Sequence, residues 1–517
     1  MMETKECRHS LYIFVALTLI LSSLAIFKYV SLHSTVCDLG IFLWVFYKMG
    51  VYGRWQLFSY GHLQPFLIPL YLFLKLFPSN LVPYIILFLQ SALLSLPSIW
   101  LLRRYGYMAL AGFVLYFPLW YNALNDFHMD HMVVPLLFGF FLLAEQKKIW
   151  LAVVCASCVA FVKEPFALQT AACGIYLMIA SRKLLAGTFL FLFGILYFHA
   201  ATRYMIPYFT TGSSFLDAPA FSWMGHGVGE KLLFIVKHPL TIISEIFSNT
   251  LKIKYLIVIF GALCFIPLSR PAMLIPAIPI IGIALLSRHD AYYSFTNHYT
   301  AGLIAPFIMA FIKGLPAAES LWEKMRLTKR MFMPLVLTIL ILGNIWFSPS
   351  FLYRYFWIPK HWERHFTAYI PTERDAIIKE AILSNIPSTP DILISTPNNI
   401  NWDYLIYRRQ FLVFPQGVMD TADEINPSEY SFHGLISFIM HGQQPQVNIE
   451  KLSADYAVID SKRPYFVFDK GCQWHYGKCT DINMEERFLG LVRKAMERYD
   501  IIYEMDGLVI LKRKTYD

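Results

Sequence analysis

The sequence predicts a mainly α-helical fold: a polytopic transmembrane helical bundle with interfacial helices and a C-terminal extracytoplasmic α/β domain. Charged residues make up only 15% of the 517 residues, whereas a soluble domain carries about 25%. The mean hydropathy is +0.48. Aromatic residues reach 17%, and Tyr and Trp favour membrane interfaces because each has an apolar ring and a polar tip. These observations indicate that lipid is the main solvent of the chain.

A membrane-spanning helix needs roughly 20 mostly apolar residues. We predict about eleven spans from the apolar stretches 11–27, 81–102, 107–125, 132–144, 149–162, 165–181, 184–202, 255–269, 271–287, 291–312 and 331–353. A twelfth apolar stretch, residues 62–77, is interrupted by Pro65, Pro69 and Lys75. We expect it to be a helix that begins near Pro65 and lies in the membrane interface.

Lys and Arg in short loops set the orientation, because such loops stay in the cytoplasm. With a cytoplasmic N-terminus, the inner loops contain Arg103-Arg104, Lys147-Lys148 and Arg182-Lys183, and all are basic. We therefore expect a multi-pass protein of the plasma (inner) membrane, with everything after about residue 350 outside the cytoplasm. These loops account for the net charge of +9, so no nucleic-acid partner is expected.

The tail predicts a second domain, residues 351–517, after a transmembrane domain of residues 1–350. A capping box at Thr372 and Asp375 precedes a helical pattern. Residues 392–394 and 455–460 are typical of strands, and Asp506-Gly507 is a hairpin turn signal. Cys472 and Cys479 predict a disulfide in an oxidising compartment. Two free thiols, or a metal site that includes His475, remain alternatives.

Titratable residues gather at the predicted outer ends of the spans and beside the interfacial stretch. They are Asp38, His62, Asp126, His128, Asp130, His131, Lys163, Glu164, His289 and His298. Each residue also has a simpler explanation. A lone Asp or His in a loop is usually just solvated, and Lys163 and Glu164 could form a structural ion pair with each other. Titratable groups at a bilayer boundary are costly unless they are paired or used. Several such clusters facing one compartment therefore predict an acid–base and phosphate-binding site.

Five stretches together resemble a known membrane-protein family, domain of unknown function 2079: CDLGIFLWVF, GHLQPFLIPLY, FHMDHMVVPLL, KEPFAL and HYTAGLIAPF. The resemblance covers most of residues 30–310 and extends loosely to the tail through DYAVID. That family in turn resembles the GT-C glycosyltransferase superfamily. The resemblance implies a catalytic acid in the first outer loop, interfacial helices after it, a multi-span body and an outer C-terminal domain. It also implies a sugar donor linked to a polyprenyl phosphate or diphosphate.

By this resemblance Asp38 is the first-loop catalytic acid, and Asp126 and Asp130 are further acids in the second outer loop. The expected reaction is inverting sugar transfer. Lys163 would stabilise the departing lipid phosphate, and the other candidates, His62, His128, His131, Glu164, His289 and His298, would bind substrate. Leu39 follows Asp38 where many members carry a second acid, which leaves a divalent metal cofactor open.

The expected partners are membrane lipids and the polyprenyl-phosphate-linked donor, and the sequence does not name the acceptor. Two other functions stay open: a transporter or flippase, and a scaffold for assembly of the cell envelope. A transporter should carry ionisable groups near the middle of the membrane. Here the predicted spans are nearly free of charge and the acids sit at their outer ends, which favours chemistry at the membrane surface.

Overall fold

The computed structural model describes residues 2–52, 58–59, 61–209, 220–358, 364–419, 422–427, 432–442, 447–463, 474–475, 478–479 and 484–514. The chain forms two compact units. Unit 1 comprises Met1–Ser23, Tyr60–Leu67 and Leu87–Arg364, and unit 2 comprises Leu24–Ser59, Ile68–Ile86 and His365–Asp517. Unit 2 therefore combines the tail with two N-terminal segments, and a domain boundary at residue 350 stays a prediction.

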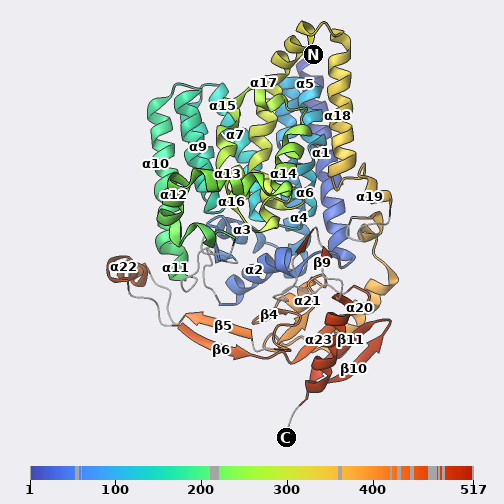
Figure 1. Cartoon of the computed structure of the whole chain (residues 1–517). Helices are drawn as coiled ribbons and strands as arrows, with labels where there is room; N and C mark the ends of the chain where they lie inside the picture. Colours follow the sequence, from blue (N-terminus) through green and yellow to red (C-terminus); the bar gives the residue numbers. More distant parts are fainter. Residues whose placement is uncertain are drawn as a thin grey trace. The chain divides into compact units, whose positions relative to one another are not determined.

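Unit 1 is built almost entirely of helices (Figure 1). With α1 and α4, which continue into unit 2, they are α1 (Met2–Val30), α4 (Val82–Ser95), α5 (Pro97–Leu115), α6 (Phe117–Leu124), α7 (Val133–Glu145), α8 (Ile149–Ala160), α9 (Pro165–Ile179), α10 (Leu184–Ala200), α11 (Ile206–Phe209), α12 (Gly227–Lys237), α13 (Pro239–Phe247), α14 (Thr250–Gly261), α15 (Pro271–Leu274), α16 (Ile278–Leu286), α17 (Ala301–Lys324), α18 (Phe332–Phe347) and α19 (Arg354–Trp357). Each of the eleven predicted stretches is helical over all or part of its length.

Five helical segments in the described part of the chain are long and apolar enough to cross a membrane. They are Arg8–Val30, Ser79–Leu115, Leu184–Phe209, His298–Lys324 and Lys329–Phe347, and three shorter apolar helices accompany them, Ile149–Ala160, Pro165–Ile179 and Pro271–Leu286. The chain is therefore a polytopic helical membrane protein. A count of eleven spans, and their orientation, stay predictions.

The segment Ser79–Leu115 is divided at Gly106. This residue has φ +80° and ψ −172° inside α5, a conformation that glycine adopts without the steric cost that a side chain would bring. The break follows Arg103-Arg104 directly. It therefore coincides with the loop that the sequence predicts between the second and third spans.

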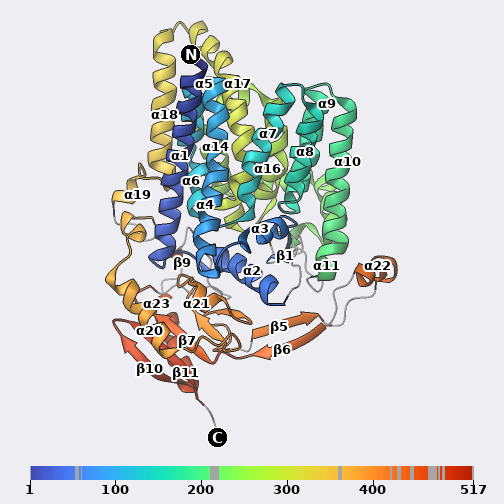
Figure 2. The ribbon, with the colours of Figure 1, turned by 180° about the vertical axis from the view of Figure 1, so that it is seen from behind.

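Helices α9 and α10 pack closely because glycines line their contact, and they lie side by side in Figures 1 and 2. A Cβ atom at Gly174 would lie 2.5 Å from the carbonyl oxygen of Gly187. A Cβ atom at Gly194 would lie 2.4 Å from the carbonyl oxygen of Ala167. Small residues of this kind let helix backbones approach each other in a membrane, where burial of apolar surface gives little driving force.

Unit 2 has a five-stranded sheet in the order β10-β11-β7-β3-β4. Its strands are β3 (Ile394–Thr396), β4 (Phe411–Val413), β7 (Tyr456–Asp460), β10 (Tyr499–Met505) and β11 (Leu508–Arg513). Strand β3 pairs in parallel with β4 and β7, whereas β11 is antiparallel to β7 and β10. The predicted strand at 455–460 and the turn at Asp506-Gly507 are confirmed, and β3 begins at the last residue of the other predicted strand.

The remaining elements of unit 2 are helices and short ladders: α2 (Ile41–Tyr52), α3 (Leu67–Leu74), α20 (Glu373–Asn385), α21 (Asp403–Ile406), α22 (Phe432–His441), α23 (Met484–Arg498), the pair β5 (Ala422–Pro427) and β6 (Val447–Leu452), the pair β8 (Trp474–His475) and β9 (Lys478–Cys479), and β1 (Phe58–Ser59). The predicted capping box is confirmed, because Thr372 and Asp375 exchange side-chain and backbone hydrogen bonds at the start of α20. This helix belongs to the α/β part of the tail.

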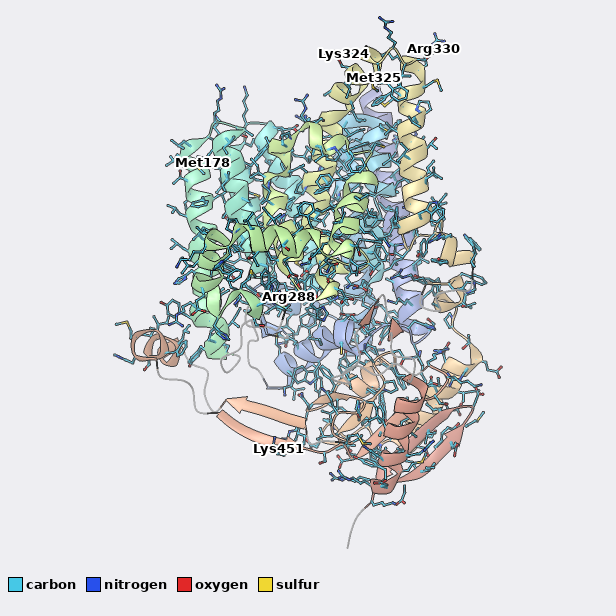
Figure 3. The ribbon with its side chains drawn as sticks, in the orientation of Figure 1. Met178, Arg288, Lys324, Met325, Arg330 and Lys451 are labelled. Carbon is cyan, nitrogen blue, oxygen red and sulfur yellow. The ribbon has the colours of Figure 1, made fainter. Side chains whose placement is uncertain are left out.

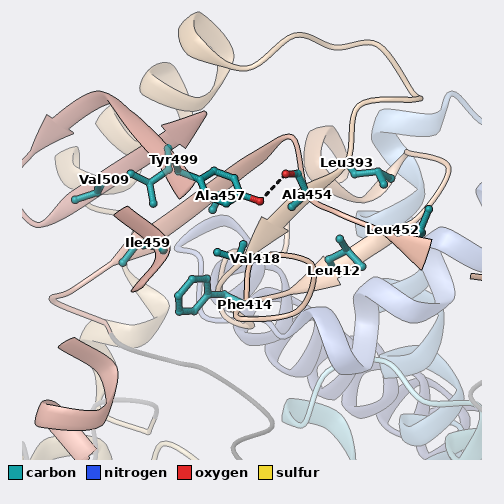
Figure 4. Close-up of a cluster of buried hydrophobic side chains, with 12 residues drawn as sticks. Leu393, Leu412, Phe414, Val418, Leu452, Ala454, Ala457, Ile459, Tyr499 and Val509 are labelled. Atoms are coloured by element: carbon teal, nitrogen blue, oxygen red, sulfur yellow. Dashed lines mark hydrogen bonds between the residues drawn. The ribbon is translucent and has the colours of Figure 1, made fainter. Parts of the chain in front are cut away.

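The sheet separates two hydrophobic cores. Ala457 and Ile459 of β7 belong to one core, and Tyr456 and Val458 belong to the other. Alternate side chains of a strand point to opposite faces, so both faces of the sheet are covered. Figure 4 shows the first core, where the Tyr499 hydroxyl donates to the carbonyl oxygen of Ala454 at 2.6 Å.

The helix expected to begin near Pro65 within the stretch 62–77 is observed as α3, which begins at Leu67, and its place in the membrane interface stays a prediction. The start of the stretch forms β2 (His62–Leu63), whose Leu63 amide donates to Glu164 Oε2 at 3.0 Å. The disulfide predicted between Cys472 and Cys479 falls on Cys472, which lies outside the described residues.

Candidate functional site

A buried carboxylate joins two distant segments of unit 1. Glu164 directly precedes α9, where Pro165 takes the first helical position. Its Oε1 accepts from His62 Nδ1 at 2.5 Å, and its Oε2 accepts from the Leu63 amide. The Glu164 side chain has no exposed surface, whereas that of His62 is 19% exposed. Glu164 therefore pairs with His62, and not with its neighbour Lys163.

A second carboxylate lies between two basic side chains. Asp130 belongs to a 3₁₀ turn, Met129–Met132, between α6 and α7. Its Oδ1 lies 3.8 Å from Lys163 Nζ, and its Oδ2 lies 3.7 Å from His298 Nε2. Both distances exceed the 3.2 Å of an ordinary N–H···O hydrogen bond. Lys163 is thus close enough to Asp130 for electrostatic attraction, but neither Lys163 nor His298 makes a short hydrogen bond with this carboxylate.

Stacked imidazoles complete this cluster. The rings of His128 and His298 are stacked with centroids 3.5 Å apart, and Asn125 Nδ2 lies 3.4 Å from His298 Nδ1. The amide of His128 donates to His131 Nδ1 at 3.3 Å. Burial, and then the neighbouring His128, lower the pKa of His131 well below its ordinary value. His131 is therefore a neutral acceptor that shapes the turn around Asp130.

A small cavity of about 40 Å³ opens beside these groups. Its lining residues are His62, Asp130, Lys163, Pro165, Phe166, Ile280, Ile283, Ala284, Tyr292 and Tyr299. One part of the wall is polar or charged, and the part from α9 and α16 is apolar. The cavity is large enough for roughly one or two water molecules.

Two stacked tyrosines form one side of the cavity. The rings of Tyr292 and Tyr299 have centroids 4.7 Å apart, and Lys163 Nζ lies 5.9 Å from the centroid of Tyr299. Burial, and then the nearby carboxylates of Glu164 and Asp130, raise the pKa of Tyr292 to about 12. Tyr292 therefore stays protonated and neutral at physiological pH.

Comparison with known proteins places the chain in a family. Residues 28–398 match the family described as predicted membrane protein, DUF2079. The chain belongs to this family. No curated protein matches it.

Among solved structures, this DUF2079 protein is similar to the crystal structure of ArnT from Cupriavidus metallidurans bound to undecaprenyl phosphate. The two chains are 14% identical, the match covers 97% of each, and the TM-score is 0.46. A likeness of this degree does not bear on the activity of the DUF2079 protein.

The predicted site residues of the DUF2079 protein fall into separate groups. His62, Asp130 and Lys163 line the cavity. Glu164 and His298 lie next to these lining residues, and the ring of His128 stacks on that of His298. Asp126 is buried with φ +55°, and its carbonyl oxygen accepts from Gln90 Nε2 at 3.0 Å, outside the cavity wall. His289 has a side chain that is 61% exposed and lies 3.7 Å from Asp290 Oδ1. It is not among the residues that line the cavity.

Asp38 belongs to unit 2 and has a different environment. Thr35 Oγ1 donates to Asp38 Oδ2 at 2.6 Å. The π-helical turn that contains it, Val36–Gly40, is tied to the tail by Asn398, which accepts from the amides of Val36 at 2.7 Å and Cys37 at 2.9 Å. The tail of the DUF2079 protein therefore positions the predicted catalytic acid.

Sequence reasoning missed several residues of these sites. Tyr292 and Tyr299 lie in a stretch that we assigned to a span, although their closeness to His289 and His298 was a usable signal. Asn398 lies in Pro397-Asn398-Asn399, a turn-forming run whose distance along the chain from Asp38 hid the contact. No group of three or more His, Cys, Asp or Glu residues with metal-binding geometry occurs in the described part of the DUF2079 protein.

Proposed function

We propose that this protein is an integral membrane glycosyltransferase that moves a sugar from a polyprenyl-phosphate-linked donor to an acceptor on the extracytoplasmic face. One observation carries the proposal. Lys163, a buried cation close to Asp130, lines a cavity whose remaining wall on α9 and α16 is apolar. A lipid phosphate combines an anionic group with a hydrocarbon chain. The lysine suits the anionic group, and the apolar wall suits the chain.

Lys163 is the phosphate ligand in this proposal. Its ammonium carries three donors, and the described separation of 3.8 Å from Asp130 leaves it without a tight hydrogen bond to that carboxylate. A phosphate oxygen would accept a hydrogen bond from Lys163, and the ammonium would stabilise the negative charge that develops on the phosphate as the sugar departs. Because the cavity is smaller than a phosphate with its lipid, the side chains around it must part to admit the ligand.

His62 is the proton-carrying group beside the phosphate. Glu164 accepts from His62 Nδ1, so a proton exchanged with the cavity passes through the other nitrogen, Nε2. A carboxylate behind an imidazole fixes its tautomer and orientation. Glu164 is thus a positioning residue, and His62 would bind or protonate the leaving phosphate.

Asp38 is the general base of the proposed reaction. Its assignment comes from the resemblance to GT-C enzymes and from its hydrogen bond with the neutral hydroxyl of Thr35. The carboxylate would take the proton of the acceptor as the acceptor attacks the anomeric carbon. The bond from that carbon to the phosphate oxygen breaks in the same step, with inversion, and the lipid phosphate keeps the electron pair.

The test compares two lysines of unit 1. Lys163→Gln removes the proposed phosphate ligand, and Lys313→Gln removes a cation that pairs with Glu145 at 2.9 Å but does not line the cavity. Binding of decaprenyl monophosphate to the full-length protein in phosphatidylcholine nanodiscs would be measured. We expect Lys163→Gln to weaken binding by about 10- to 100-fold, the size of one charge-assisted hydrogen bond, and Lys313→Gln to leave it unchanged. Equal binding by both variants, with both folded, would contradict the proposal.

A further inference from the structure

A second charged cluster lies in unit 1 outside the cavity. Arg288 donates to Glu245 Oε2 through Nη2 at 2.9 Å and Nε at 3.2 Å. Lys252 Nζ donates to Glu245 Oε1 at 3.2 Å. We call these three residues the Arg288 cluster, and Arg288 is labelled in Figure 3. Two cations share one carboxylate, so the cluster carries a net charge of +1.

The excess charge resides on Arg288. The Lys252 side chain has no exposed surface and that of Glu245 is 19% exposed, whereas that of Arg288 is 53% exposed. Burial alone would raise the pKa of Glu245, but hydrogen bonds from Arg288 and Lys252 outweigh it and lower that pKa. Glu245 is therefore anionic and neutralises the buried lysine. The contacts with Glu245 use two of the five N–H groups of the guanidinium, which lies 4.6 Å from the ring centroid of Trp223.

The surface beside the cluster is apolar. Helices α12 and α13 carry a row of large aliphatic and aromatic side chains that are each more than half exposed. They are Leu232, Leu233, Val236, Leu240, Ile243 and Phe247. In a membrane protein such a row is expected to contact lipid chains. A cation at the border of this row meets the phosphates of lipids, and not bulk water alone.

The same region adjoins the cavity. Trp223, which lies under Arg288, donates from Nε1 to the carbonyl oxygen of Leu286 at 3.0 Å. Trp223, Ile283 and Tyr292 belong to one hydrophobic cluster, and Ile283 and Tyr292 also line the cavity. The Arg288 cluster and the cavity are therefore on two sides of one packed wall made by α12, α13 and α16.

We propose that the Arg288 cluster is a docking site for the phosphate of the polyprenyl-linked lipid, which it takes from the membrane before the lipid reaches Lys163. This inference rests on the proposed function and adds the route of the donor. The positive charge selects the phosphate, the apolar row on α12 and α13 guides the chain, and the shared wall leads to the cavity. Arg288 is a docking residue and takes no part in the chemical step.

The experiment follows arrival of the lipid at the cavity. Full-length protein in phosphatidylcholine nanodiscs is mixed with decaprenyl monophosphate that carries a photoreactive group on its first isoprene unit. The rate at which cavity peptides become labelled, and the labelling at saturation, are measured by mass spectrometry. The variants are Arg288→Gln, Arg288→Lys, Glu245→Gln and the matched control Arg270→Gln, since Arg270 is an exposed arginine at the opposite end of the α15–α16 segment.

We expect Arg288→Gln to slow labelling by about fivefold, the effect of one cation near a lipid surface, without changing saturation. Arg288→Lys and Arg270→Gln should label at the wild-type rate. Glu245→Gln raises the charge of the cluster to +2, so its cavity peptides should become labelled at the wild-type rate or faster. A merely structural ion pair predicts the reverse, since Glu245→Gln would break the cluster and slow labelling.

Three results would overturn the inference. One is equal labelling rates for Arg288→Gln and Arg270→Gln, and a second is slower labelling of Glu245→Gln. The third is equally strong competition by phosphatidic acid, which would make the cluster a general site for anionic lipids. If Lys163→Gln lowers saturation while Arg288→Gln has no effect, the proposed function survives and the docking site does not. If the cavity peptides of the wild type are not labelled at all, both the proposed function and the docking site are contradicted.

Discussion

Two acids that the sequence placed in one predicted site have different surroundings. Asp130, in unit 1, is 2% exposed and lies 3.7–3.8 Å from His298 and Lys163. Asp38, in unit 2, is half-buried and accepts from the neutral hydroxyl of Thr35. A carboxylate next to a lysine holds the ammonium in place for an anionic ligand. In the proposed reaction Asp130 would therefore orient Lys163 toward the phosphate, whereas Asp38 would take the proton of the acceptor.

The largest expected effect comes from Asp38→Asn. The amide keeps the size of the side chain and can still accept from Thr35, so the turn at Val36–Gly40 should persist. It cannot take a proton from the acceptor, and we expect sugar transfer to fall by about 100- to 10,000-fold. Because the acceptor is not known, complementation of a deletion strain with full-length variants is the first practical measurement.

The control for this prediction is Asp130→Asn, which should weaken decaprenyl phosphate binding, whereas Asp38→Asn should not. Full complementation by Asp38→Asn would transfer the catalytic role to Asp126 or Asp130. Full complementation with all three acids replaced would remove the glycosyltransferase proposal itself.

An effect of intermediate size is expected from Glu164→Gln, compared with a second paired acid of unit 1. Glu164→Gln keeps an acceptor for the Leu63 amide but removes the carboxylate that accepts from His62 Nδ1. One hydrogen bond to a charged group is worth about 1.5–3 kcal/mol, so transfer should fall by about 10- to 100-fold. Glu145→Gln is the matched control, because Glu145 is also a paired acid of unit 1. Sugar transfer at the wild-type rate in Glu164→Gln would reduce the pair to a structural role.

The sequence predicted elements that depend on local pattern. Long apolar runs predicted the helices, and the short apolar run at 456–459 predicted β7, because a strand buried on both faces needs only a few consecutive apolar residues. The capping box at Thr372 was predictable because its hydrogen bonds span three residues. Gly106 was not singled out, although the break that it makes coincides with the predicted loop.

Contacts between distant segments were less predictable. Lys163 and Asp130 were both assigned to the site at the outer ends of the predicted spans, and they lie 3.8 Å apart. The pairing of His62 with Glu164 was not expected, because a short sequence motif does not identify a contact with a residue about a hundred positions away. The short strand at His62–Leu63 was not expected either, and its Leu63 amide donates to the distant Glu164. The tie between Asn398 and the Asp38 turn likewise depends on the tertiary fold.

The smallest expected effect is a pH dependence confined to unit 2. Burial, and then the nearby Arg463, lower the pKa of His33 from 6.5 to about 4. Its Nδ1 donates to the carbonyl oxygen of Ser31 at 2.8 Å, and Arg463 donates to that oxygen and to Asp375 Oδ1. The folded protein therefore holds His33 neutral, whereas the unfolded chain binds a proton below about pH 6.5. This contribution to stability is complete above pH 6.5 and is lost as the pH falls toward 4.

At about pH 5 the loss should be about 2 kcal/mol, from 1.36 kcal/mol for each pH unit below 6.5. Hydrogen–deuterium exchange of β3, β7 and β11 in the full-length protein measures it. His33→Gln cannot bind the proton, so its protection should change less between neutral pH and pH 5 than that of the wild type. Comparing the two proteins at each pH cancels the intrinsic dependence of exchange on pH. If both lose protection equally, His33 is not responsible, and the ion pairs of Asp375 with Arg463 and of Asp460 with Arg374 become the groups to examine.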